Sequence, residues 1–308
     1  MKKLFGSLIL IIFSSVVFGQ QLPQYSQWFW NQLILNPSHS GIKRCVEVKT
    51  QIRAQYLGIE GAPNSGNFTL SIPIPTLRKR FLGTRHGVGL NFERDQIGPF
   101  SGNRFNLSYA VHMNFTQNNR LSVGIGAGMK QWSFNKDKSS TLVPDPVLAQ
   151  NGSFLSPDAN IGFWWNGENY YLGLALNELI RNRWDNISNE SRFKIHYSLS
   201  GGYRWVLKKG ITLMPSLMLR FPPKSKISTD ITLMADFNNQ FGIGLGFRNT
   251  DAIMAYLNVK IKEQFQIGYS FDYVISPIGG NRFFTHEISL TLNGCKVYTP
   301  TSTGCPLF

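Results

Sequence analysis

A ten-residue stretch, Gln264–Tyr273, alternates strictly between large apolar side chains and polar or glycine residues. Because successive side chains on a β-strand point to opposite faces, this stretch has one apolar face and one polar face. Ten residues are enough for a tilted strand to cross a bilayer. The same alternation recurs through most of the sequence, which predicts a closed antiparallel β-barrel in a bacterial outer membrane.

The amino terminus is predicted to be a cleaved export signal that covers residues 1–19. Lys2 and Lys3 precede an apolar stretch from Leu4 to Phe18, and a small-residue cleavage site precedes Gln20. A membrane anchor is the alternative, but the apolar run is short for a spanning helix and no stop-transfer charges follow it. No cysteine stands at the cleavage point, which argues against a lipid-anchored protein.

No later segment holds the ~20 continuous apolar residues that a spanning helix needs. The mean hydropathy is slightly negative. These features exclude a helical membrane protein, but they are compatible with a barrel, because the residues that face the lumen of a barrel are polar.

The formal net charge of +14 is spread over predicted turns and inward positions, with one cluster at residues 78–80. A basic chain can bind nucleic acid, but no zinc-ligand spacing or aromatic-rich recognition motif accompanies this charge. Attraction to anionic lipid headgroups or to an acidic partner is the interpretation we favour.

The alternation predicts about fourteen strands. They lie near Cys45–Tyr56, Asn64–Ile74, Arg85–Arg94, Phe105–Phe115, Leu121–Lys130, Ala159–Trp165, Glu168–Leu176, Ile195–Trp205, Ile211–Phe221, Ile227–Phe237, Phe241–Arg248, Ile253–Lys260, Gln264–Tyr273 and Phe283–Asn293. Connections after even-numbered strands are mostly short, and those after odd-numbered strands are mostly long. This asymmetry is typical of short periplasmic turns and longer outer loops.

Aromatic residues near the strand ends predict interfacial girdles, namely Trp132, Trp164, Trp165, Tyr170, Tyr171, Trp205, Phe283 and Phe284. A soluble sandwich is the alternative. It would need cover for the outward apolar face of all fourteen strands, and no helical segment is left to provide it.

Three cysteines suit an oxidising compartment with at most one internal bridge. Closure of the barrel would place the first strand beside the last, so a bridge between Cys45 and Cys295 could join them. A bridge between Cys295 and Cys305 could instead close the tail, and free thiols are the third possibility.

No residue pattern predicts catalysis, a metal site or a bound cofactor. The alternating glycines of residues 124–128 and 242–246 lie inside strands, so they predict small lumen-facing positions and not a phosphate loop. His112 and His196 are expected to face inward in ordinary hydrogen-bonded roles. Asp272 is expected to face the lumen and to pair with an inward arginine such as Arg204 or Arg248.

Several short motifs that run along the whole chain resemble the PorP/SprF family. The amino-terminal motif is Gln24-Tyr25-Ser26-Gln27, then Asn31, then Leu35-Asn36-Pro37 and Gly41. Later matches are Gln55-Tyr56, Gly61-Ala62-Pro63, Gly87-Val88-Gly89, Asp95-Gln96-Ile97-Gly98, Pro215-Ser216, Gly268-Tyr269-Ser270-Phe271-Asp272 and His286-Glu287-Ile288. His39, Ser40 and the cysteine-bearing tail depart from the family pattern.

The resemblance implies a non-enzymatic outer-membrane protein of Bacteroidetes that acts in type IX secretion and gliding motility. The implied partners are translocon subunits, the carboxy-terminal domain of a secreted type B adhesin, or a periplasmic peptidoglycan-linked protein, together with outer-membrane lipid. A passive channel or a transporter of hydrophobic ligands is the alternative function.

Residues 20–44 are predicted to form a separate segment before the barrel of residues 45–294, which is followed by a periplasmic tail of residues 295–308. This segment is too polar to span a membrane, yet it holds several aromatic side chains. It could fill the lumen as a plug, with Asn31 and Asn36 hydrogen-bonded to inward residues, it could dock a periplasmic protein, or it could simply pack under the barrel. The candidate partner-binding residues are Gln24, Tyr25, Ser26, Gln27, Trp28, Trp30, Asn31, Asn36 and Pro37.

Overall fold

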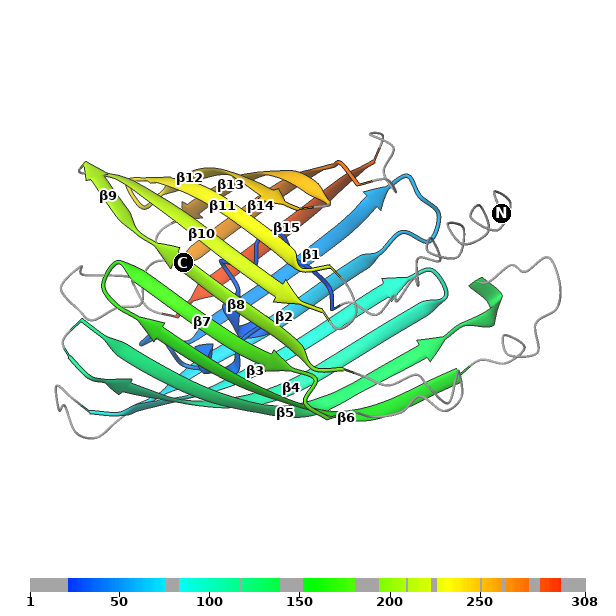
Figure 1. Cartoon of the computed structure of the whole chain (residues 1–308), viewed down its shortest axis with the longest axis horizontal. Coiled ribbons are helices and arrows are strands. Elements are labelled where there is room, and N and C mark those ends of the chain that lie inside the picture. The colour runs from blue at the N-terminus through cyan, green and yellow to red at the C-terminus, as the bar shows by residue number, and fades with distance from the viewer. Residues whose placement is uncertain are drawn as a thin grey trace, which may run out of the picture.

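The computed structural model of the chain contains fifteen described strands in one antiparallel sheet that closes into a barrel (Figure 1). The structure describes residues 22–75, 83–116, 118–138, 152–180, 194–208, 210–222, 226–249, 251–261, 264–276 and 283–294. The predicted export signal and the predicted carboxy-terminal tail lie outside the described residues.

The strands follow the chain around the barrel. They are β1 (Glu47–Leu57), β2 (Asn64–Ile74), β3 (Arg85–Ile97), β4 (Phe100–Asn114), β5 (Arg120–Phe134), β6 (Gly152–Asn166), β7 (Tyr170–Asn177), β8 (His196–Tyr203), β9 (Trp205–Lys208), β10 (Ile211–Phe221), β11 (Ser228–Phe237), β12 (Phe241–Arg248), β13 (Ala252–Ile261), β14 (Phe265–Val274) and β15 (Phe284–Asn293). Three short 3₁₀ helices, η1 (Gln32–Ile34), η2 (Pro37–His39) and η3 (Lys136–Lys138), complete the described elements.

The first and last strands meet at a seam, where Glu47 of β1 lies opposite Asn293 of β15. β8 and β9 are two parts of one strand that is interrupted at Arg204, whose backbone N–H donates to Asn169 O at 2.6 Å. Both parts pair with β10, which also pairs with β11. The fifteen strands therefore make a closed barrel of fourteen, which confirms the predicted fold.

Some strands are longer than the alternation predicted. β4 begins at Phe100 and β6 at Gly152, and a tight turn joins β3 to β4 where a long loop was expected. The added positions include inward-facing charges, which find partners across the lumen. Arg104 on β4, for example, lies 3.2 Å from Glu93 and 3.3 Å from Glu178. Ion pairing thus lets strands continue through residues that resemble loop sequence.

The barrel is apolar outside and polar inside. On β1, Ile52 is 66% exposed whereas the adjacent Arg53 is 1% exposed, and the same alternation holds along β14. No helix among the described residues is both long enough and apolar enough to cross a membrane.

The predicted aromatic girdles are only partly correct. Trp165 faces outward and is 46% exposed, but its neighbour Trp164 faces inward and is buried. Tyr171 is buried as well and stacks on Trp164, with the ring centroids 4.5 Å apart. Since adjacent strand residues point to opposite faces, only one member of each aromatic pair can reach the lipid.

The two ends of the barrel differ. The connections between β6 and β7 and between β11 and β12 are short and lie at one end, here called the short-turn end. The opposite, long-loop end carries the long connections between β5 and β6 and between β7 and β8. We assign the short-turn end to the periplasm, as in other outer-membrane barrels.

Candidate functional site in the lumen of the barrel

Residues 22–46, here called the lumen segment, run through the inside of the barrel and are drawn in dark blue in Figure 1. At the long-loop end, Gln24 accepts a hydrogen bond from Ser228 at 3.2 Å. At the short-turn end, Lys43 pairs with Glu47 at the start of β1. The segment therefore crosses the lumen from one end of the barrel to the other.

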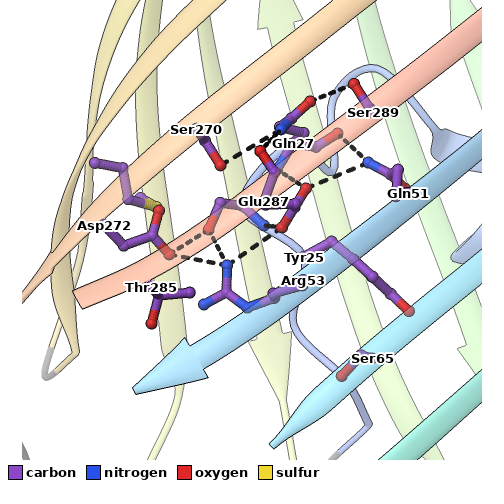
Figure 2. Close-up of polar contacts among 12 residues, drawn as sticks. Tyr25, Gln27, Gln51, Arg53, Ser65, Ser270, Asp272, Thr285, Glu287 and Ser289 are labelled. Carbon is purple, nitrogen blue, oxygen red and sulfur yellow. Dashed lines mark hydrogen bonds and ion pairs between the residues drawn. The ribbon is translucent and has the colours of Figure 1, made fainter. Parts of the chain in front are cut away.

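A group of polar residues, here called the seam clasp, holds the lumen segment against the strands where the barrel closes (Figure 2). Its members are Ser26, Gln27, Arg53, Asp272 and Glu287. The Glu287 carboxylate accepts the backbone N–H of Ser26 at 2.7 Å and that of Gln27 at 3.0 Å. The Ser26 hydroxyl donates to Asp272 at 2.6 Å.

Arg53 supplies the positive charge of the seam clasp. Its guanidinium lies 2.8 Å from Asp272 and 3.2 Å from Glu287, and all three side chains are almost fully buried. Because a buried charge is stable only when it is paired and hydrogen-bonded, the two carboxylates and the guanidinium depend on one another. One cation on β1 thus binds acids on β14 and β15 and, through them, the lumen segment.

Asp272 faces the lumen and pairs with an inward arginine, as predicted, but the arginine is Arg53 and neither of the two that were named. Arg248 lies directly opposite Asp230 in the β11–β12 register and pairs with it at 2.8 Å, so it is already neutralised. Arg204 lies between β8 and β9, away from β14. Arg53 reaches Asp272 because its own register partner is Glu287, and Glu287 pairs in turn with Ser270 of β14.

Three consecutive aromatic residues of the lumen segment fill an apolar socket in the barrel wall. Trp28, Phe29 and Trp30 pack against the buried side chains Met214, Met218, Met234, Ala252, Met254 and Tyr256. Phe29 and Tyr256 meet edge to face, with their ring centroids 5.3 Å apart. Methionine is flexible and polarisable, which suits it to fill the irregular space around aromatic rings.

Two asparagines bind the lumen segment to other parts of the wall, as the plug hypothesis required. The Asn31 amide donates to Gln51 at 3.3 Å and to Asn67 at 3.1 Å. The Asn36 amide donates to the backbone oxygen of Phe163 at 3.0 Å. The Asn36 side-chain oxygen accepts the Ser38 N–H and so caps η2, in which Pro37 takes the first position.

Glycines in the wall make room for η2. A Cβ on Gly124 would lie 2.4 Å from backbone atoms of Pro37 and Ser38, and one on Gly87 would lie 2.2 Å from Ser40 O. These contacts leave no space for any side chain. Of the inward glycines that the sequence predicted as packing positions, Gly124 thus lets the lumen segment lie directly on the sheet, whereas its neighbours Gly126 and Gly128 face wall residues.

Two histidines have structural roles next to the contact between η2 and the barrel wall. His112 is buried, with Nδ1 2.7 Å from Ser122 Oγ and Nε2 2.9 Å from Ser40 O. His39 packs edge to face on Trp164, with the ring centroids 4.1 Å apart. It therefore acts as a packing residue.

All nine candidate partner-binding residues lie in the lumen segment, and all but Gln24 are buried. The sequence did not single out their counterparts in the wall, above all Arg53, Met218 and Met254. A usable signal was present: methionines recur at inward positions of β10, β11 and β13, where a barrel lumen usually has polar side chains. Among the described residues, no group of acids, histidines and cysteines could hold a metal ion.

Cys45 forms a disulfide in the structure. Its possible partners, Cys295 and Cys305, both lie outside the described residues. The backbone N–H of Gly294 donates to Val46 O at 2.8 Å, so the residues next to Cys45 and Cys295 in the chain lie side by side. We predict the Cys45–Cys295 pairing.

Mass mapping of non-reduced tryptic peptides checks this pairing. We expect one linked peptide that contains residues 45 and 295, and a Cys305 thiol that reacts with iodoacetamide. A linked peptide that joins Cys45 to Cys305 would refute the prediction.

A family model described as "Type IX secretion system membrane protein PorP/SprF" matches residues 17–292, which is most of the chain. The chain belongs to the PorP/SprF family. The sequence-based resemblance is thereby confirmed, and with it the assignment to an outer-membrane barrel of the type IX secretion system. PorP/SprF proteins are not enzymes, so the lumen segment has to be explained as a structural or binding element.

Solved structures share the barrel fold of this PorP/SprF protein. One is a FadL homologue from Pseudomonas aeruginosa, with a TM-score of 0.51, 10% identity, and coverage of 90% of this chain and all of the other. Another is the monoaromatic hydrocarbon channel CymD, with a TM-score of 0.50, 9% identity, and coverage of 90% of this chain and 94% of the other. At such identities the likeness concerns the fold alone. No curated protein matches the chain.

Proposed function

We propose that this PorP/SprF protein binds a translocon component, or the carboxy-terminal domain of a secreted type B adhesin, for export or surface attachment. A periplasmic peptidoglycan-linked protein is a further partner of the same proposal. The protein would act as a binding component in secretion and gliding motility, without catalysis.

One observation carries the proposal beyond family membership: the lumen is occupied by a segment that is fixed along its whole length. The segment is held in three places. The seam clasp binds residues 26 and 27, the apolar socket of four methionines, Ala252 and Tyr256 holds the three consecutive aromatic residues, and η2 lies directly against Gly124 of the wall. A porin needs a water-filled bore lined by charge. Here the inward charges are buried in ion pairs with one another, as in the Arg104–Glu93 and Arg248–Asp230 pairs. This arrangement favours a binding role over the passive channel.

Deletion of residues 24–41 tests the proposal. We expect the variant to lose its partners in affinity purification from detergent-solubilised outer membranes, with the partners identified by mass spectrometry. The barrel itself should persist, and its heat-modifiable migration on gels is the control. Unchanged co-purification of every partner would contradict a role for the lumen segment in binding.

Planar-bilayer recording of the intact protein distinguishes the proposed binding function from the alternative function of a passive channel. A binding component with a filled lumen should show rare or no openings. Steady, large conductance would favour a passive channel.

A further inference from the structure

The short strand β9 differs from every other described strand because all four of its residues are exposed. Trp205 is 60% exposed, Val206 54% and Leu207 49%. In a strand that forms part of the barrel wall, only alternate residues are exposed, since the others face the lumen. Three consecutive exposed apolar residues therefore show that both faces of β9 are uncovered.

The position of β9 explains this exposure. The last rung that β7 and β8 share pairs Tyr170 with Tyr203, two aromatic residues of the kind found at the headgroup level of outer-membrane barrels. β9 continues past this rung, by roughly 13 Å for four residues at the usual rise of a strand. It therefore extends past the first residue of β7 at the short-turn end, and Figure 1 shows its hairpin with β10. On the other side, β10 and β11 remain paired at the same height.

One edge of β9 has no partner among the described strands. β9 pairs with β10 through Trp205 and Leu213, and it is the terminal strand in the order of the sheet. Its other edge lies beyond the first residue of β7. A free strand edge presents unpaired N–H and C=O groups, and it is a ready template for an added strand.

Two cations flank this edge, because Arg204 precedes β9 and Lys208 ends it, and Arg44 is exposed at the same end. Lys43 and Lys260 are already paired with Glu47 and Asp236. Glu168 in the turn between β6 and β7 is an exposed acid nearby, so the charge next to β9 is positive on balance. A segment that pairs with β9 would thus be favoured by acidic side chains.

We propose that the free edge of β9 is a docking site for an extended segment of a periplasmic protein, in which apolar and acidic residues alternate. The segment would add a strand to the sheet, with its apolar side chains on the face of Trp205 and Leu207 and its acidic side chains on the opposite face, which carries Lys208. This inference deepens the proposed binding function and rests on it. It places the contact at β9, on the rim of the barrel at the short-turn end, and not in the lumen.

Site-specific photo-crosslinking in living cells tests the docking site. The photoreactive amino acid p-benzoyl-phenylalanine would be incorporated at position 206 or position 208, and at Leu217 as a lipid-facing control that is 41% exposed on β10. We expect protein adducts from positions 206 and 208, and lipid adducts alone from position 217. In a paired strand, the two adducts should map about two residues apart on one partner segment.

Two charge variants test the acidic nature of the partner. Val206→Glu should reduce the adduct from position 208 at least tenfold, whereas Val206→Lys should preserve it. Both variants should keep heat-modifiable migration, because the side chain of Val206 is 54% exposed. Equal loss in both variants would overturn the acidic assignment, and lipid adducts alone from positions 206 and 208 would overturn the docking site.

The deletion of residues 24–41 separates this inference from the role of the lumen segment. If adducts from position 206 persist in the deletion variant, the rim binds its partner independently of the lumen. If the intact protein gives neither a rim adduct nor a co-purified partner, the binding function itself fails.

Discussion

Replacing Arg53 with alanine will release the lumen segment from the seam. The substitution leaves Asp272 and Glu287 buried side by side with no cation, although Glu287 still accepts the two backbone N–H groups. Removing one partner of a buried ion pair costs about 3–5 kcal/mol. A change of that size raises the population of the released segment more than about 100-fold. Planar-bilayer recording should show frequent openings, and protease should cleave the segment.

Two variants make this expectation specific. Arg94→Ala is the matched control, because Arg94 is exposed on β3, and we expect a change within about 0.5 kcal/mol. In the Arg53→Ala background, Glu287→Gln should restore part of the closed state, since it removes the repulsion between the carboxylates and keeps an oxygen that accepts N–H. Conductance of Arg53→Ala like that of the unmodified protein would refute the role given to the clasp.

Replacing Gly124 with valine will displace η2 while leaving the barrel closed. The new Cβ would lie 2.4 Å from backbone atoms of Pro37 and Ser38, which cannot move without moving the segment. Overpacking of a tight contact costs about 1–3 kcal/mol. The β5 strand keeps its pairing because the backbone conformation of a strand accepts valine readily. We expect faster proteolysis within residues 36–41 and unchanged heat-modifiable migration.

Gly66→Ala is the matched control for this substitution. Gly66 also lies within a strand, but its added Cβ would meet Gln51 O at 3.7 Å, an ordinary contact. Its proteolysis should match that of the unmodified protein. If Gly124→Val and Gly66→Ala are cleaved at the same rate, the close approach of η2 to β5 does not hold the segment in place.

Much of the fold follows from the amino-acid alternation alone. A period of two is a local property, so strands such as β2 and β12 could be placed from the sequence with the bounds that the structure shows. The interruption at Arg204 could not be placed, because it depends on where the neighbouring β7 begins. The extra length of β4 and β6 was missed because charged inward residues resemble loop residues until their partners across the lumen are known.

The sequence predicted the residues of the lumen segment but not the residues of the barrel wall that bind them. The motifs of residues 24–37 identified the lumen segment, and the two asparagines were assigned hydrogen bonds that the structure contains. Their wall partners depend on the register of several strands at once. Which arginine meets Asp272 is decided by the pairing of β1 with β15 and of β15 with β14, and no local pattern encodes that pairing.

The seam clasp also bears on how the molecule assembles. β1 and β15 come from opposite ends of the chain, and Glu287 of β15 binds both Arg53 of β1 and the backbone of residues 26–27. When β15, the last strand to be synthesised, pairs with β1, it therefore closes the barrel and binds the lumen segment in the same step. In a folding intermediate that lacks β15, the sheet would be open and the lumen segment would lack its hydrogen bonds to Glu287. Closure of the barrel in the bilayer and ordering of the lumen segment are therefore expected to finish together.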